Sequence, residues 1–122
     1  MIEITDEVLA EIAGAIAAEI DPVLIILFGS HASGDASPES DLDLLIVERE
    51  PFGQKRSRRK EISIVRELLS GFRVAKDILV YSEEEFSKWR GSVNHVIGRS
   101  LRDGRVLYER PRIFPALCKS HL

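Results

Sequence analysis

The feature that most constrains the fold is an unbroken apolar run, Val-Leu-Ile-Ile-Leu-Phe, at residues 23–28. It is short, rich in β-branched residues and apolar on both faces, which is typical of a central strand covered on both sides. It is far shorter than the roughly 20 apolar residues that cross a bilayer, and the N-terminus has no basic-then-apolar signal segment. We therefore expect a strand within a small sheet, in a cytoplasmic protein without membrane association.

The segments around this run predict further helices and strands. Thr5 and Asp6 suit the start of an amphipathic helix that ends near residues 21–22, because apolar residues recur there at three- and four-residue spacing. Residues 29–40 are rich in Gly, Ser, Ala and Pro, which indicates a tight turn with a short helix or loop. A second strand is expected over residues 41–47.

A helix and a third strand follow the second strand. The helical pattern is closed by Gly71, and its apolar positions are Ile62, Val65, Leu68 and Leu69. The third strand is expected at roughly residues 73–81. Since a helix separates these two strands, the chain has the alternating pattern of an α/β protein.

The segment after the third strand begins with a helix signal. Ser82 and Glu85 have the spacing of a capping box, so a helix is expected to start there and to carry Phe86 and Trp89 inward. We interpret these two aromatic residues, together with Tyr81, as packing residues. The alternative is that they stack on an adenine ring.

The end of the chain completes a single domain. A last helix is expected over about residues 92–103, and residues 106–108 form either a short edge strand or an extended packing segment. The predicted fold is α/β (α+β), a small mixed sheet flanked by helices, in a domain of residues 1–110. Residues 111–122 are expected to be an irregular tail, because prolines interrupt them.

Three aspartates lie in or beside the apolar strands. Because side chains alternate along a strand, Asp41 and Asp43 point to one face, about 6.5 to 7 Å apart at the backbone. Asp77 lies within the third strand and joins them if that strand neighbours the second. Such carboxylates repel a triphosphate by roughly 4 kcal/mol per pair at 4 Å and an effective dielectric of about 20, so a divalent cation is needed between them. Oxygen ligands favour Mg²⁺ or Mn²⁺, and two ions suit an in-line phosphoryl displacement.

The loop before the second strand is suited to phosphate. Gly29 and Gly34 let the backbone approach a phosphate closely, and Ser30 offers a hydroxyl and an N–H group. The alternatives are a plain turn for this loop, solvated acids for the strand aspartates, and a turn cap or lysine pair for Asp77. His31 is interpreted as an exposed side chain, with nucleotide contact as the alternative.

Gly29-Ser30, ten intervening residues and Asp41-x-Asp43 resemble the signature of the DNA polymerase beta-like nucleotidyltransferase superfamily. Together with the third strand and the Asp-Gly-Arg-Val-Leu-Tyr-Glu segment at residues 103–109, the chain resembles the minimal nucleotidyltransferases, or MntA-like antitoxins, over roughly residues 20–110. One departure is His31, which replaces the arginine or tyrosine often found after Gly-Ser.

This resemblance implies a function and a partner. It makes Asp41, Asp43 and Asp77 catalytic metal ligands for Mg²⁺, with Asp77 also placed as a base, and it makes Gly29 and Ser30 binders of the triphosphate. It implies a HEPN-domain toxin as partner in a hetero-oligomer, with AMP transferred from ATP to a tyrosine of that toxin. The alternatives are nucleotide transfer to a small molecule such as an aminoglycoside, and an antitoxin that acts by binding alone.

The remaining charged and reactive residues suggest less. The net charge of −3 does not favour nucleic acid as a partner. The basic run at residues 55–60 is interpreted as a solvated loop or helix face, with a partner or phosphate contact as the alternative. Cys118 has no second cysteine to pair with, so a passive role is expected.

Overall fold

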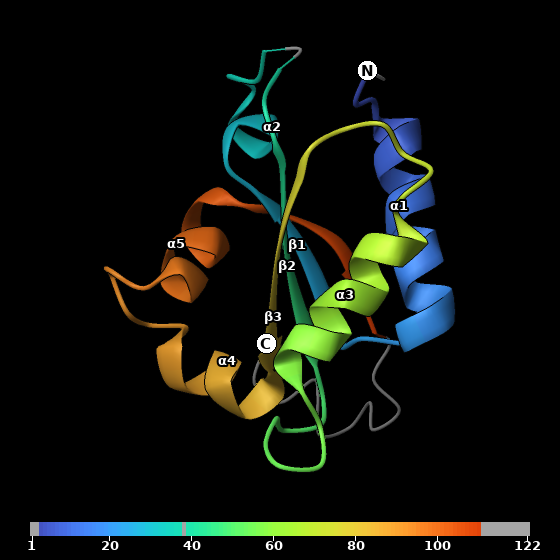
Figure 1. Ribbon diagram of the computed structural model, residues 1–122. Coiled ribbons are helices and arrows are strands. Elements are labelled where there is room, and N and C mark those ends of the chain that lie inside the picture. Colours follow the sequence, from blue (N-terminus) through green and yellow to red (C-terminus); the bar gives the residue numbers. More distant parts are fainter. Residues whose placement is uncertain (1–2, 38, 111–122) are drawn as a thin grey trace.

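The computed structural model describes residues 3–37 and 39–110 and shows alternating helices and strands around one sheet (Figure 1). The predicted tail of residues 111–122 lies outside the described residues. The elements are α1 (Asp6–Ile20), β1 (Leu24–Phe28), α2 (Ser30–Ser33), β2 (Leu42–Glu48), α3 (Arg58–Leu68), β3 (Lys76–Ser82), α4 (Glu83–Trp89), α5 (Val96–Asp103) and β4 (Arg105–Glu109). In this described part, no helix is long and apolar enough to span a membrane.

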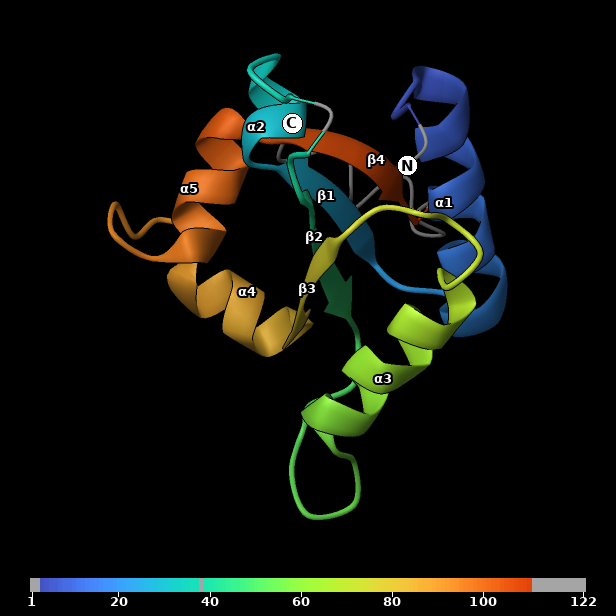
Figure 2. The same cartoon turned by 45° about the horizontal axis from the view of Figure 1, so that its top comes forward.

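The sheet is mixed and has the strand order β3-β2-β1-β4. β1 is antiparallel to both β2 and β4, whereas β2 and β3 are parallel and are joined by the crossover helix α3. Helices α1 and α3 cover one face of the sheet, and α4 and α5 cover the other (Figure 2). This arrangement confirms the predicted mixed sheet flanked by helices.

Side-chain alternation along β2 divides the core into two layers. Leu44 and Ile46 pack towards α1 and α3, whereas Leu45 and Val47 pack towards α4 and α5. All four side chains are buried. The central strands are therefore apolar on both faces, as the run at residues 23–28 predicts. Asp43 is on the same face as Leu45, so its carboxylate projects on the α4–α5 side of the sheet.

Side-chain caps fix where the helices begin. The Thr5 hydroxyl accepts a hydrogen bond from the Val8 N–H at 3.2 Å. At the start of α4, the Glu85 N–H donates to the Ser82 hydroxyl at 3.1 Å, and the Ser82 N–H donates back to the Glu85 carboxylate at 2.9 Å. The predicted capping box is thus confirmed in both of its halves.

Two element boundaries differ from those predicted. β3 begins at Lys76 rather than Arg73, because the Val74 N–H turns back to the Phe72 carbonyl at 2.9 Å. α5 begins at Val96, since the preceding residues form a connection whose Ser92 carbonyl packs against the helix. Residues 106–108 belong to β4, which pairs with β1 at the sheet edge, so the edge-strand alternative is the observed one.

Trp89 does not point inward, contrary to the prediction. Phe86 is buried, but Trp89 is 37% exposed and stacks on the His95 ring with centroids 4.6 Å apart. The His95 ring also accepts a hydrogen bond from the Ile97 N–H and thereby caps α5. The capping box locates the start of α4, whereas the neighbouring connection determines where its last turn faces.

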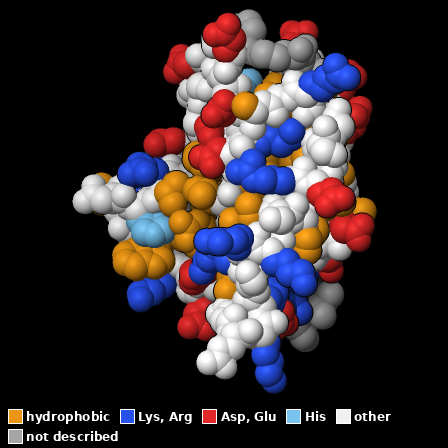
Figure 3. Space-filling model, in the orientation of Figure 1, with side chains coloured by type: hydrophobic (Ala, Val, Ile, Leu, Met, Phe, Trp, Pro, Cys, Tyr) orange, Lys and Arg blue, Asp and Glu red, His pale blue; other side chains and the backbone are white. Residues whose placement is uncertain are grey.

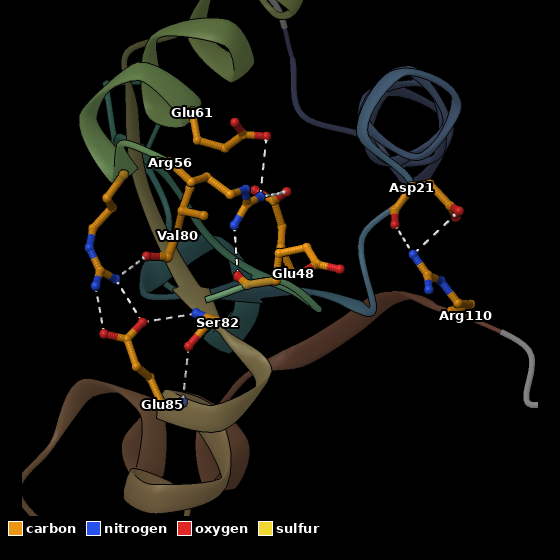
Figure 4. Close-up of polar contacts among 10 residues, drawn as sticks. Asp21, Glu48, Arg56, Glu61, Val80, Ser82, Glu85 and Arg110 are labelled. Atoms are coloured by element: carbon orange, nitrogen blue, oxygen red, sulfur yellow. Dashed lines mark hydrogen bonds and ion pairs between the residues drawn. The ribbon is translucent and has the colours of Figure 1, made fainter. Parts of the chain in front are cut away.

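The basic run is not simply a solvated surface. Arg56 contacts the buried carboxylate of Glu48 at 2.5 Å (Figure 4). Arg58 contacts Glu85 at 2.5 Å. Both arginines are half-buried and lie over the Phe52 ring. These two arginines join the start of α3 to β2 and to α4. The interpretation of the basic run as a solvated face is therefore wrong for Arg56 and Arg58.

Glu48 should make stability depend on pH. Burial, followed by repulsion from Glu61, raises the pKa of Glu48 from 4.5 to about 7, against the opposing effect of Arg56. Since this pKa is higher in the folded than in the unfolded chain, stability falls as pH rises from about 4.5 to about 7. The Glu48→Gln variant lacks this component, so its free energy of unfolding should change less between pH 5 and pH 8, by on the order of 2 kcal/mol. Urea melts at both pH values test this, and an unchanged pH difference would contradict it.

Candidate active site

The three aspartates lie at one end of the sheet. Asp43 on β2 is directly opposite Asp77 on β3 in the parallel register. Asp77 lies two residues before Leu79 on β3 and therefore shares its face, and Leu79 packs on the α4–α5 side. The carboxylates of Asp43 and Asp77 thus project from the same face of the sheet. Asp41 precedes β2 by one residue and is exposed, as is Asp77. The condition stated from the sequence, that the third strand neighbours the second, is therefore met.

Asp43 is the most constrained of these carboxylates. It is half-buried, and burial, followed by repulsion from Asp77 and Asp41, raises its pKa above the usual value of 3.8. His31 acts in the opposite direction. Ionisation of Asp43 is thus less favourable than for a free aspartate, and a positive charge near it would be stabilising.

Gly29 lies against the Asp43 carboxylate. Its φ is +75°, a conformation that favours glycine, and an added Cβ would lie 2.1 Å from the Asp43 Oδ2 atom. Gly29 precedes the single turn of α2, where the Ala32 N–H donates to the Gly29 carbonyl at 3.1 Å. The absence of a side chain therefore allows the loop backbone and a strand carboxylate to meet at one point.

The rest of the loop is held by local hydrogen bonds. Gly34 ends α2 with a φ of +87°, and its N–H donates to the Ser30 carbonyl at 3.1 Å. His31 is half-buried rather than exposed, and its Nε2 lies 3.2 Å from the Ser40 carbonyl oxygen. The interpretation of His31 as an exposed side chain is therefore wrong, because it connects the loop to the segment that enters β2.

A cleft of about 560 Å³ opens beside this loop, on the α5 side. Phe28, Gly29 and Ser33 line one wall. The other wall is one face of α5, formed by Val96, Arg99, Ser100 and Asp103. The sequence alone does not indicate a role for Arg99, because only the packing of α5 beside β1 brings it to the loop. The signal that the sequence does contain is the helical spacing of Arg99 from Val96 and Asp103, which places these three residues on one face of α5.

The donor chemistry at this end of the sheet suits a divalent cation only in part. Carboxylate oxygens are the ligands that Mg²⁺ prefers, and burial together with the charges of Asp77 and Asp41 raises the pKa of Asp43. Among residues 3–37 and 39–110, however, no three His, Cys, Asp or Glu side chains are grouped closely enough to hold a metal ion by themselves. A cation here would need ligands from outside the protein, such as phosphate oxygens and water.

Comparison with known proteins defines the class. A family model described as the nucleotidyltransferase domain matches residues 9–107, and the chain belongs to this family. A relative from Methanocaldococcus jannaschii, provisionally named a protein adenylyltransferase, is 41% identical over 85 residues, covering 69% of this chain and 76% of the relative. The predicted membership of the nucleotidyltransferases is therefore confirmed.

Solved structures share the fold. A toxin–antitoxin complex of MntA and HpeT in a mutant form contains a chain that is 15% identical with a TM-score of 0.57, covering 96% of this chain and 83% of that one. A toxin–antitoxin structure with AMP-PNP contains a chain that is 18% identical with a TM-score of 0.55, covering 83% of this chain and 73% of that one. At these identities the likeness concerns the arrangement of helices and strands.

Proposed function

We propose that this chain is a Mg²⁺-dependent adenylyltransferase that transfers AMP from ATP to a tyrosine of a HEPN-domain toxin, for which it serves as antitoxin. The observation that carries the proposal is the meeting of Asp43, Asp77 and the Gly29 backbone at one end of the sheet. Membership of the nucleotidyltransferase family supports the reaction class. The adenylyltransferase relative and the toxin–antitoxin fold neighbours support the nucleotide and the partner.

The carboxylates and the loop would divide the work of binding. Asp41 and Asp43, with Asp77, would hold Mg²⁺, in one or two ions, with Mn²⁺ as a substitute and phosphate oxygens completing the coordination. The bound metal supplies charge neutralisation and Lewis acidity. Gly29, Ser30 and Gly34 would hold the triphosphate against the short helix α2. Burial, followed by repulsion from Asp77 and Asp41, raises the pKa of Asp43, and a bound cation would offset that repulsion.

The transfer step follows from this placement. The acceptor hydroxyl oxygen would form a bond to the α-phosphorus of ATP, and the bond from that phosphorus to the oxygen bridging to the β-phosphorus would break. Asp77 is exposed beside Asp43 and would accept the hydroxyl proton. Pyrophosphate would leave. The contribution of the protein is positioning and electrostatic stabilisation.

Product analysis tests the reaction class. We would incubate the chain with the toxin, ATP and Mg²⁺ and separate the phosphate products by chromatography. The proposal expects pyrophosphate in amounts equal to the AMP transferred. Formation of ADP and inorganic phosphate instead would indicate a kinase or an ATPase and would contradict it.

We expect Arg99 to supply a positive charge to the ATP phosphates, because His31 stands where an arginine or tyrosine often follows Gly-Ser. It lines the cleft beside Gly29, and one of its N–H groups already donates to the Asn94 carbonyl at 2.9 Å, which orients the side chain. The Arg99→Gln substitution should weaken ATP binding by about tenfold or more, as expected for loss of a charge-assisted hydrogen bond, and should affect adenosine much less.

Arg102 offers a matched control for this test. It lies on the same helix and also donates to a carbonyl of the preceding connection, that of Val93 at 2.9 Å, but it does not line the cleft. Calorimetric titration of both variants with ATP and adenosine separates the roles. Equal loss of ATP affinity in Arg99→Gln and Arg102→Gln would contradict a specific phosphate contact.

A binding antitoxin without catalysis is the second candidate function. It is favoured by the finding that no three potential ligands among the described residues are grouped to hold a metal ion. Growth rescue distinguishes it from the enzyme. If a chain with both Asp41→Asn and Asp43→Asn neutralises the co-expressed toxin as well as the wild type, the binding role is correct and the catalytic one is not needed.

A further inference from the structure

The connection between α4 and α5 carries apolar side chains into solvent. Val93 is 70% exposed and Trp89 is 37% exposed. In Figure 3 hydrophobic and histidine side chains gather at this connection, at the left of the molecule, with Lys and Arg side chains beside them. Tryptophan is enriched among residues that dominate binding energy, so an exposed tryptophan with an exposed valine on the same connection makes this surface a candidate for partner binding.

The connection is held in one shape. The Ser92 N–H donates to the Trp89 carbonyl at 3.0 Å, and two α5 arginines donate to the Val93 and Asn94 carbonyls at 2.9 Å each. At Gly98 an added Cβ would lie 1.8 Å from the Ser92 carbonyl oxygen, so the connection packs directly on the helix. Stacking on His95 orients the Trp89 ring. Such preorganisation reduces the entropy lost on binding.

The same surface is basic in a chain that is acidic overall. Between Phe86 and Arg102 the sequence has no Asp or Glu, although the net charge of the chain is −3. The cations of this stretch are all exposed, and the Lys88 Nζ lies 5.3 Å from the centroid of the Trp89 ring. We define the α4–α5 surface as Trp89, Val93, Lys88, Arg90 and Arg102, and leave out Arg99 because it lines the cleft beside Gly29.

We infer that the α4–α5 surface is the docking site for the protein acceptor, and that it binds an acidic face of that protein around an apolar recess that receives Trp89 and Val93. The inference rests on the proposed function for the existence of a protein acceptor. The surface belongs to the two helices on the face from which Asp43 and Asp77 project, so an acceptor seated on it is on the correct side of the sheet. Complementary charge would speed association and define the orientation.

Charge substitution tests the docking site without disturbing the core. Val93→Glu and Lys88→Glu each place an acid on the α4–α5 surface, and neither residue contributes to the proposed catalytic site. Ile64→Glu is the matched control, because Ile64 is 37% exposed on α3, on the opposite side of the sheet. We would measure the affinity of each variant for the HEPN-domain toxin, and for ATP, by calorimetry.

The expected result is a dissociation constant for the toxin that rises about tenfold or more in both surface variants, as for hot-spot residues, with ATP affinity unchanged and no effect of Ile64→Glu. If both surface variants bind the toxin as tightly as the wild type does, this inference is contradicted and the proposed function is not. A wild-type chain that binds no toxin contradicts the proposed function and this inference together. If single-stranded RNA binds and only that binding is lost in the variants, the surface belongs to a nucleic acid and the inference is overturned.

Discussion

The Asp43→Asn substitution is expected to lower nucleotidyl transfer by about 10³-fold or more while the chain stays folded. Asp43 lies opposite Asp77 and against Gly29, so its charge is central to any cation held there. Loss of one preorganised electrostatic group commonly reduces a rate by about 10²–10³-fold, and loss of a metal ligand should add to this. A steady-state transfer assay measures the effect, and a variant with full activity would contradict the assigned role.

The same variant should be at least as stable as the wild type in EDTA. Burial, and repulsion by Asp77 and Asp41, raise the pKa of Asp43 in the folded chain above 3.8. A carboxyl with a raised pKa reduces stability as pH rises through the interval between its unfolded and folded pKa values, and the loss persists above that interval. Asn removes this loss. Thermal melts at pH 7.5 should therefore show an equal or higher Tm, and Mg²⁺ should stabilise the variant less than the wild type.

Asp35→Asn is the control for that comparison. Asp35 is an exposed acid of the same loop region and accepts a hydrogen bond from the Ser33 hydroxyl at 3.1 Å. It lies in the loop before β2, outside the strand register that places Asp43 opposite Asp77. Its removal changes the net charge equally, so transfer should remain within about twofold if the role of Asp43 depends on position.

The second large effect is expected at Gly29. A Gly29→Ala substitution would place a methyl group 2.1 Å from the Asp43 Oδ2 atom and would also require a φ of +75° from an alanine. The loop or the carboxylate must then move. We expect a loss of stability of about 1–3 kcal/mol and a loss of transfer activity of at least about 10²-fold, because small displacements at a reacting centre are costly.

Gly34→Ala separates strain from collision. Gly34 has a φ of +87° and no atom within 4 Å of an added Cβ. Both glycines belong to the proposed triphosphate loop, but Gly34 has only the conformational strain and not the contact with Asp43. Its loss of stability should therefore be similar or smaller, and its loss of activity should be smaller by the part that the collision with Asp43 contributes. Urea unfolding and a transfer assay on both variants provide the comparison. Equal activity losses would mean that the approach of Gly29 to Asp43 is unimportant.

The local parts of the site could be predicted from the sequence. Alternation along a strand places Asp41 and Asp43 on one face. The sequence predicts that Asp77 joins them if the third strand neighbours the second, and the parallel register shows that it does. The composition of residues 29–40, which is rich in Gly, Ser, Ala and Pro, likewise predicts the tight turn that contains Gly29 and Gly34. These features depend on short stretches of chain, where strand periodicity and turn chemistry determine the structure.

The parts that depend on distant contacts could not be predicted. Arg58 is paired with Glu85 across 27 positions, and Arg99 reaches the cleft only because α5 packs beside β1. The helical spacing of Trp89 from Phe86 predicts a place in the core, but the connection to α5 provides His95 as a stacking partner outside the core. Periodicity gives the direction of a side chain relative to its helix, whereas tertiary packing determines what lies in that direction.

The most direct test of nucleotidyl transfer is to follow label from ATP to the co-expressed HEPN-domain toxin, with the label on the α-phosphate in one sample and on the γ-phosphate in another. Each sample is assayed with Mg²⁺ and with EDTA. The proposed function predicts that the toxin is labelled only from the α-phosphate, only with Mg²⁺, and only with intact Asp41 and Asp43. Label from the γ-phosphate, or no label from a chain that binds and neutralises the toxin, would contradict it.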